Sequence, residues 1–304
     1  EGITTTDIEG GGGYNNGDYN DDFGGTSSAT PLVSGVVALI LEANPNLTYR
    51  DIEHIIVQSS RVNDANDNGW NVNGAGHDVN HKYGFGVIDA SAAVALAENW
   101  VNVDPEINFQ SGLIDVLDRQ IPDNSAPGIS EVTYVPDSIK VEHVEVIVDI
   151  DHTYRGDLEI ILTSPAGTQS VLSEKHEDSG NNWNNWMFTS VHHWDEDSYG
   201  DWTLSIEDQG NGDTGTLYDW ELNIYGTEIN TDRDGDGLTN YDEVSIYGTD
   251  PDDIDTDDDQ INDGEEINIY GTNPLSIDTD GDNLEDGREI LVNGTDPLNI
   301  DTDA

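Results

Sequence analysis

The sequence predicts a multidomain protein in which part of an α/β domain precedes an all-β jelly roll and an irregular array of short repeats. Apolar residues follow a helical pattern in roughly the first third of the chain and alternate along short runs in the middle third. The last quarter is poor in apolar residues and repeats itself every 23 residues. A chain of 304 residues is long enough for two or three domains.

Three helices are expected in the first segment. Residues 32–41 are apolar on all sides of a helix, which predicts a buried helix. Thr48 and Asp51 form a capping-box pattern before a second helix. Asp89 is placed to cap a third, Ala-rich helix that ends near Trp100. Because three helices with so little strand cannot form a complete α/β domain, we expect them to be one side of a larger fold whose sheet lies upstream.

The middle segment has the alternation of half-buried strands. Apolar residues occupy every second position in 144–150, 158–162, 202–206 and 220–224. Turns rich in Gly and Asn separate these runs. Many short strands joined by such turns predict a β-sandwich or jelly roll.

The last segment consists of repeated units. The sequence Gly-Thr-Asp/Asn-Pro begins at Gly248, Gly271 and Gly294, and an Ile recurs with the same period. Such regular self-similarity predicts an array of small stacked units.

Each unit contains an Asp-rich loop with the spacing of an EF-hand calcium loop, in which oxygen ligands occupy positions 1, 3, 5, 7, 9 and 12. The first loop offers Asp232, Asp234, Asp236, the Leu238 carbonyl, Asn240 and Glu243. The second offers Asp255, Asp257, Asp259, Asp263 and Glu266. The third offers Asp278, Asp280, Asp282, Asp286 and Glu289. Calcium is therefore the predicted cofactor, because this hard cation takes six to eight oxygen ligands.

The loops differ from true EF-hands, because a helix on each side does not fit within 23 residues. The sharp turn is made by Gly237 in the first loop, but by Gln260 and Asn283 in the others. Asn tolerates a left-handed backbone better than Gln, so the middle loop matches the pattern least well. A disordered acidic tail is the alternative interpretation of this segment.

The charge of the chain excludes several kinds of partner. With 64 acidic and 9 basic residues, the formal charge is -55, which opposes a compact state unless cations or salt compensate. Nucleic acid and anionic membranes are therefore excluded as partners. No Cys is present, so there are no disulfides or thiolate metal sites. The apolar stretch 31–41 is shorter than the roughly 20 residues of a membrane span, so no membrane insertion is predicted.

A candidate nucleophile, Ser27, lies in the segment Gly-Thr-Ser-Ser-Ala-Thr-Pro at residues 25–31, directly before the apolar helix. The N-terminus of a helix offers unpaired N–H groups and a positive dipole end. Both stabilise the oxyanion that forms when a hydroxyl attacks a carbonyl. The alternative is a serine that only caps the helix.

Segment 25–31 resembles the Gly-Thr-Ser-x-Ala-x-Pro signature of the subtilisin superfamily (peptidase S8), in which the Ser attacks the peptide carbonyl. Residues 42–51 and 81–90 resemble the kexin and furin branch, proprotein convertases that carry a jelly-roll P domain after the catalytic domain. Residues 155–158, 200–204 and 220–222 are similar to that P domain. The 23-residue units resemble thrombospondin type 3 repeats.

The resemblance implies three domains. These are the C-terminal part of a subtilisin-like catalytic domain (1–102), a P domain (105–227) and calcium-binding repeats (228–304). It also implies that the triad Asp and His and the oxyanion Asn lie upstream of Ser27, so this chain alone is expected to be inactive. Because Glu1 is no initiator residue and Ala304 falls inside a repeat, we expect a fragment.

The eight histidines are expected to be surface or capping residues. Two further metal sites, less clearly indicated, are possible. The alternative is that the same side chains are ordinary turn residues that bind no metal. One would use His192, His193 and Asp195, and the other would use carboxylates of the P domain. The second set comprises Asp149, Asp151, Asp157 and Asp208.

The resulting hypothesis is a secreted or cell-surface, calcium-dependent serine endopeptidase acting on proteins or peptides. The kexin resemblance implies cleavage after basic residues, and attachment to a cell surface beyond the C-terminus stays open. The alternative is a non-catalytic, calcium-dependent adhesion or surface-binding protein that retains Ser27 by descent.

Overall fold

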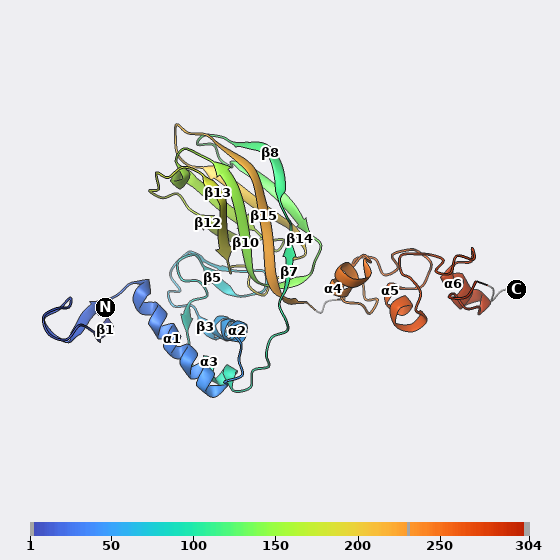
Figure 1. The fold of residues 1–304 in the computed structure, drawn as a ribbon, viewed down its shortest axis with the longest axis horizontal. Coiled ribbons are helices and arrows are strands. Elements are labelled where there is room, and N and C mark those ends of the chain that lie inside the picture. The colour runs from blue at the N-terminus through green and yellow to red at the C-terminus, as the bar shows by residue number, and fades with distance from the viewer. Residues whose placement is uncertain (1–2, 230–231, 301–304) are drawn as a thin grey trace. The chain divides into compact units, whose positions relative to one another are not determined.

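The computed structural model describes residues 3–229 and 232–300 (Figure 1). The chain divides into two compact units, which are described separately. Unit 1 comprises Glu1–Asn71 and Asp78–Val103, and unit 2 comprises Val72–His77 and Asp104–Ala304. Asp301 and Asp303, where a fourth repeat is expected to begin, lie outside the described residues.

Unit 1 consists of three helices and short two-stranded sheets. The helices are α1 (Thr26–Ala43), α2 (Tyr49–Ser59) and α3 (Ala90–Ala97). The antiparallel pairs are β1 (Ile3–Thr6) with β2 (Tyr19–Phe23), β3 (Ser60–Arg61) with β6 (Val87–Ile88), and β4 (Trp70–Val72) with β5 (Asp78–Asn80). Because α3 contacts both longer helices, a small core forms among them, made of Ile40, Leu47, Ile55, Ala93 and Ala97.

The predicted helix caps are confirmed. The Thr48 hydroxyl accepts a hydrogen bond from the backbone N–H of Asp51, whose carboxylate accepts one from the backbone N–H of Thr48. The other carboxylate oxygen of Asp51 accepts from the Trp100 indole at 3.0 Å and from the Val103 N–H at 2.7 Å. The Asp89 carboxylate caps α3, which ends at Ala97, shortly before the expected position.

The expectation that the first helix is buried is wrong for this structure. Only Ser28 and Ile40 of α1 are buried, and the side chain of Leu32 is 60% exposed. The neighbouring helices cover one side of α1, and no other element among the described residues covers the remaining sides. By length and composition, this 18-residue helix could also cross a membrane, a test that the core helix of a soluble protein passes equally.

Unit 2 contains a β-sandwich of two antiparallel sheets (Figure 1). One sheet has the order β13-β10-β15-β7, with β8 also paired to β15, and the other has the order β12-β11-β14-β9. Strands of the first sheet are β7 (Ile107–Gln110), β8 (Ile114–Ile121), β10 (Ile139–Asp151), β13 (Trp183–Ser190) and β15 (Gly215–Glu228). Strands of the second are β9 (Ile129–Val135), β11 (Leu158–Thr163), β12 (Gln169–Ser173) and β14 (Gly200–Asp208), and a short helical turn, η1 (Arg155–Asp157), precedes β11. The predicted all-β segment is confirmed.

The alternation seen in the sequence places one face of each strand in the core. The apolar side chains of all four predicted runs are fully or almost fully buried and form one cluster. Two tryptophans, Trp202 and Trp220, are the largest of them. The segment 72–77 packs in the same unit, since the Asn73 side-chain amide donates to the carbonyls of His192 and Trp194 at 3.1 and 2.9 Å.

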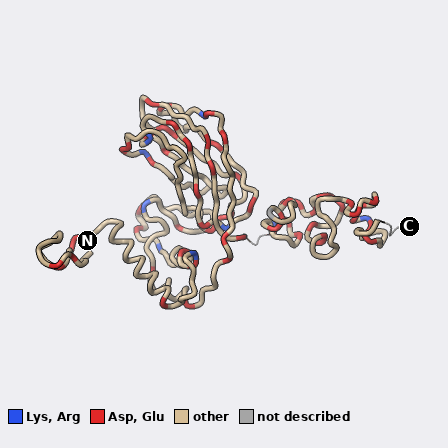
Figure 2. Tube along the Cα trace, in the orientation of Figure 1, with Lys and Arg blue, Asp and Glu red and all other residues tan. Residues whose placement is uncertain are grey.

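The repeats each consist of an Asp-rich loop followed by one short helical turn. The turns are α4 (Asn240–Asp242) with η2 (Glu243–Tyr247), α5 (Asp263–Glu265) with η3 (Glu266–Tyr270), and α6 (Asp286–Arg288) with η4 (Glu289–Asn293). A glycine with positive φ ends each turn. Each loop thus has one short helical turn per 23-residue unit, in place of the two helices of an EF-hand. Acidic residues run through all three repeats (Figure 2).

Shortening a core side chain is expected to destabilise the sandwich. Leu204 is 1% exposed, so Leu204→Ala should lower the free energy of unfolding by about 2–5 kcal/mol. The control is Val132→Ala on the neighbouring strand, where Val132 is 55% exposed and at most about 1 kcal/mol should be lost. Urea unfolding followed by tryptophan fluorescence measures both, and equal losses would contradict this assignment of the core.

Candidate functional site

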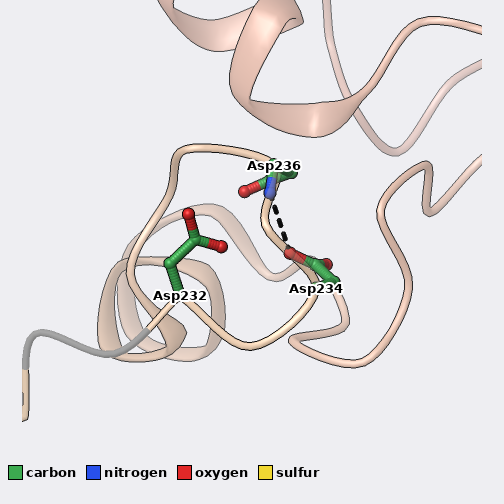
Figure 3. Close-up of side chains that lie close together, drawn as sticks. All are labelled: Asp232, Asp234 and Asp236. Carbon is green, nitrogen blue, oxygen red and sulfur yellow. Dashed lines mark hydrogen bonds between the residues drawn. The ribbon is translucent and has the colours of Figure 1, made fainter.

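The first Asp-rich loop folds around its own carboxylates (Figure 3). One carboxylate oxygen from each of Asp232, Asp234 and Asp236 lies within 4.8 Å of the other two. The backbone N–H groups of Gly235 and Gly237 donate to the two oxygens of Asp232, at 2.8 and 3.1 Å. The loop therefore holds three negative groups close together.

The second and third loops repeat this geometry. Their first three carboxylates also gather within 4.8 Å, as Asp255 with Asp257 and Asp259, and as Asp278 with Asp280 and Asp282. The turn residue donates its N–H to the first Asp in both, from Gln260 at 2.9 Å and from Asn283 at 2.8 Å. Both turn residues take the left-handed backbone that Gly237 takes in the first loop, with φ of 84° and 77° against 101°. The middle loop thus keeps the same fold despite its Gln.

The glutamate at the twelfth position of each loop is buried. Glu243, Glu266 and Glu289 have no exposed surface. The hydroxyls of Thr249 and Thr272 donate to one oxygen of the first two, at 3.4 and 2.9 Å. The other oxygen of each has no hydrogen-bond partner. In Glu289, both carboxylate oxygens lack one. Buried carboxylate oxygens without a partner cost free energy unless a cation or a proton compensates them.

Burial and the crowding of carboxylates raise the pKa values of several side chains in the loops. Burial, reinforced by the negative charges of neighbouring aspartates, raises the pKa of Glu243 and of Glu266 to about 8. The same causes raise the pKa of Asp257 to about 6. A divalent cation would relieve this repulsion, and the ligand types fit calcium, since every group offered is a hard oxygen.

The remaining predicted ligands are placed differently. The N–H of Leu238, whose carbonyl is the predicted seventh-position ligand, donates to Asp236 at 2.7 Å. The ninth-position side chains of Asn240, Asp263 and Asp286 each accept a hydrogen bond from a backbone N–H near the start of their own loop. Asp286 also lies within 4.8 Å of buried oxygens of Asp259 and Glu266, which belong to the preceding repeat. Spacing within a single loop could not reveal this grouping.

Ser27 is exposed at the second residue of α1. Gly25 is the N-cap of this helix, and no side chain caps it. The neighbouring Ser28 is buried, and its hydroxyl donates to the Gly25 carbonyl at 2.7 Å. The interpretation of Ser27 as a helix-cap serine is therefore wrong, and its hydroxyl stands at the positive end of an 18-residue helix.

The expectation that all histidines are surface or capping residues is wrong for His54, His152 and His193, which are 3%, 2% and 0% exposed. His152 Nε2 lies 3.3 Å from Asp208, with both side chains fully buried. His193 Nδ1 lies 3.6 Å from Glu196. His152 and Asp208 are distant in the sequence, and His193 and Glu196 lie in one turn. No local sequence pattern predicts the burial of either pair.

The two weaker metal sets are engaged in other contacts. Asp195 pairs with His77 at 2.8 Å and with Lys140 at 3.1 Å. In the second set, Asp208 pairs with His152, and Asp157 lies 3.6 Å from Lys175. Within the described residues, the groups of three or more side chains able to hold a metal all lie in the repeats.

Three family models match successive parts of this chain. The Subtilase family matches residues 2–86, the Proprotein convertase P-domain matches residues 141–224, and the Bacterial TSP3 repeat matches 232–253, 255–276 and 278–300. The matches follow the order in which the helical unit, the sandwich and the repeats occur.

Curated relatives match about two thirds of this chain or more. The chain is 39% identical to Furin-1 of Xenopus laevis over 234 residues, which is 72% of this chain and 29% of the relative. It is 41% identical to proprotein convertase subtilisin/kexin type 4 of Mus musculus over 216 residues, 68% of this chain and 33% of the relative. The chain thus spans about a third of the length of these relatives.

A solved structure is similar over about three quarters of this chain. The serine protease of Aeromonas sobria in complex with its chaperone superposes with a TM-score of 0.68 and 26% identity, covering 74% of this chain and 51% of that protease. The described fold, the matched families and these relatives lead to one conclusion: the chain belongs to the subtilisin-like serine proteases of proprotein convertase type, and it holds the C-terminal part of such a protease, with its P domain and TSP3 repeats.

Proposed function

We propose that this chain is part of a secreted or cell-surface serine endopeptidase that depends on calcium, with Ser27 as the nucleophile. The observation that carries the proposal is the exposed Ser27, placed at the start of α1 within the segment that matches the Subtilase family. Its Gly-Thr-Ser context is the one in which that family's serine attacks the peptide carbonyl.

The local geometry supports this role. The backbone N–H of Ser27 lies in the first turn of α1, where N–H groups lack carbonyl partners within the helix. An oxyanion formed by attack of the hydroxyl would be stabilised by such an N–H and by the helix dipole. A histidine base and its orienting aspartate, which the family provides from segments before the serine, would complete the triad. We therefore expect residues 1–304 alone not to hydrolyse peptides.

Each of the three segments would have its own role. Residues 1–102 would belong to the catalytic domain, 105–227 would form the P domain that braces it, and 228–304 would form a calcium-stiffened spacer. The ligands of the three ions would be the oxygens at loop positions 1, 3, 5, 7, 9 and 12. Binding of calcium supplies positive charge where the buried glutamates have none.

Protein or peptide substrates follow from the protease relatives. A net charge of -55 favours approach of basic polypeptides through electrostatic attraction. It opposes nucleic acid and anionic membranes as partners for the same reason. Cleavage after basic residues is the specificity that we propose.

Labelling tests the nucleophile. The full-length protease should react with a fluorophosphonate probe in calcium, and Ser27→Ala should abolish both labelling and peptide hydrolysis. Ser34→Ala, which removes another hydroxyl from the same helix, should leave both intact. Labelling that persists in Ser27→Ala would overturn the assignment, and an unreactive wild-type protein would favour the adhesion alternative.

Calcium titration tests the loops. Calorimetry on residues 1–304 should detect calcium binding, and Glu266→Gln should lower the affinity of the second loop about tenfold or more, because it removes a buried ligand. Glu265→Gln removes the same charge from an exposed position next to it and should have little effect. Equal effects of the two substitutions would contradict the assignment of Glu266 as a ligand.

A further inference from the structure

The aspartate at the ninth position of a loop closes that loop by accepting a backbone N–H on one of its oxygens. The backbone N–H at the second loop position donates to Asp263 Oδ1 at 2.9 Å and to Asp286 Oδ1 at 2.9 Å. In the first repeat, Asn240 Oδ1 accepts the equivalent bond from the Arg233 N–H at 3.0 Å. Loop closure therefore requires one side-chain oxygen, which an amide provides as well as a carboxylate.

Asp286 also lies beside carboxylates of the preceding repeat. Oxygens of Asp286, Asp259 and Glu266 all lie within 4.8 Å of one another, and the three side chains are 0%, 2% and 0% exposed. Asp286 Oδ2 and Glu266 Oε2 are buried and have no hydrogen-bond partner. Two oxygens on opposite sides of one calcium ion, each about 2.3–2.6 Å from it, stand about 4.6–5.2 Å apart, so this separation fits a shared ion.

A backbone contact holds the neighbouring repeats in this arrangement. The N–H of Gly287 donates to Asp259 Oδ2 at 2.8 Å, and the N–H of Gly264 donates to Asp236 Oδ2 at 2.6 Å. A Cβ on Gly287 would lie 2.0 Å from the Asp259 carbonyl oxygen, too close for any other residue. The residue after the ninth position must therefore be glycine wherever a repeat packs on a preceding loop.

The junction between the first two repeats has the same backbone contact. Asp263 is fully buried, and the N–H of the next residue, Gly264, donates to Asp236 Oδ2 in the first loop at 2.6 Å. Asp263 Oδ2 accepts a hydrogen bond from the Thr256 hydroxyl at 2.6 Å, which leaves it a second lone pair.

The first repeat lacks both features, and this difference has a physical reason. It has Asn240 and Tyr241 where the later repeats have Asp-Gly at 263–264 and at 286–287. No calcium loop precedes it, because the strand β15 ends at Glu228. The second atom of Asn240 is an amide nitrogen, a donor that cannot bind a cation.

We propose that Asp263 and Asp286 each supply a ligand to the calcium ion of the preceding repeat, so that every such ion is held by two repeats. This inference rests on the proposed calcium binding and assigns the ninth-position ligands to a different loop from the one that spacing implies. Each bound ion would then fix the next repeat in place, which couples calcium binding to the stiffness of the array.

The test is a calcium titration of isotopically labelled residues 1–304, followed by NMR at backbone amides of each loop. Asp286→Asn keeps the loop-closing oxygen, as Asn240 does, and removes only the second one. We expect the affinity of the second loop to fall about tenfold or more, as for the loss of a ligand, while the third loop changes much less. Glu285→Gln, the same charge change at an exposed neighbour, should leave both loops unchanged.

Several outcomes would overturn the proposal. Weakening of the third loop alone would return Asp286 to its own loop, and unchanged affinity in both loops would remove it as a ligand. If the wild-type chain shows no response to calcium at any loop, the proposed calcium function fails as well, which distinguishes the two failures. Asp263→Asn repeats the test at the first loop, and the P-domain amide shifts report whether each variant is folded.

Discussion

The structure of the repeats depends on one constraint, the close approach of negatively charged side chains. Each loop brings three aspartates within 4.8 Å of one another and adds a buried glutamate. Backbone N–H groups offset part of the repulsion, because the first and third aspartates of each loop accept hydrogen bonds from the turn that they enclose. Burial first, and then the charges of neighbouring aspartates, still raise the pKa of Glu243 and of Glu266 to about 8. The cost of this arrangement thus gives the proposed cation binding a physical basis that does not depend on resemblance to other loops.

The sandwich and the repeats are stabilised in different ways. The sandwich buries a continuous cluster of aliphatic and tryptophan side chains between two sheets. Among the described residues of the repeats, few apolar side chains are buried: Leu238, Ile261, Pro251, Pro274 and Pro297. Such units cannot rely on the hydrophobic effect, so contacts between neighbours, such as the N–H of Gly287 on Asp259, carry more of their order. The same contacts bring the ninth-position aspartate to the preceding loop.

In the helical unit, the backbone at the start of α1 leaves the hydroxyl of Ser27 exposed. Gly25, with φ of 77°, begins α1 without a side-chain cap, and Ser28 forms the local hydrogen bond. Ser27 is thereby left with its hydroxyl free for a reaction partner, at a helix start where N–H groups lack acceptors.

The sequence by itself determined the features that arise within a few residues of one another. The capping box of Thr48 and Asp51, the alternation of 144–150 and the gathering of Asp232, Asp234 and Asp236 are local, because helix, strand and loop periodicity act over short distances. Tertiary structure alone decided which oxygens meet from different repeats and which polar groups are buried. The contact of Asp286 with Asp259 and Glu266, the burial of His152 beside Asp208 and the exposed side of α1 all depend on neighbours distant in the chain. Periodicity carries no information about such neighbours, since burial and charge are properties of the surroundings of a residue and not of its type.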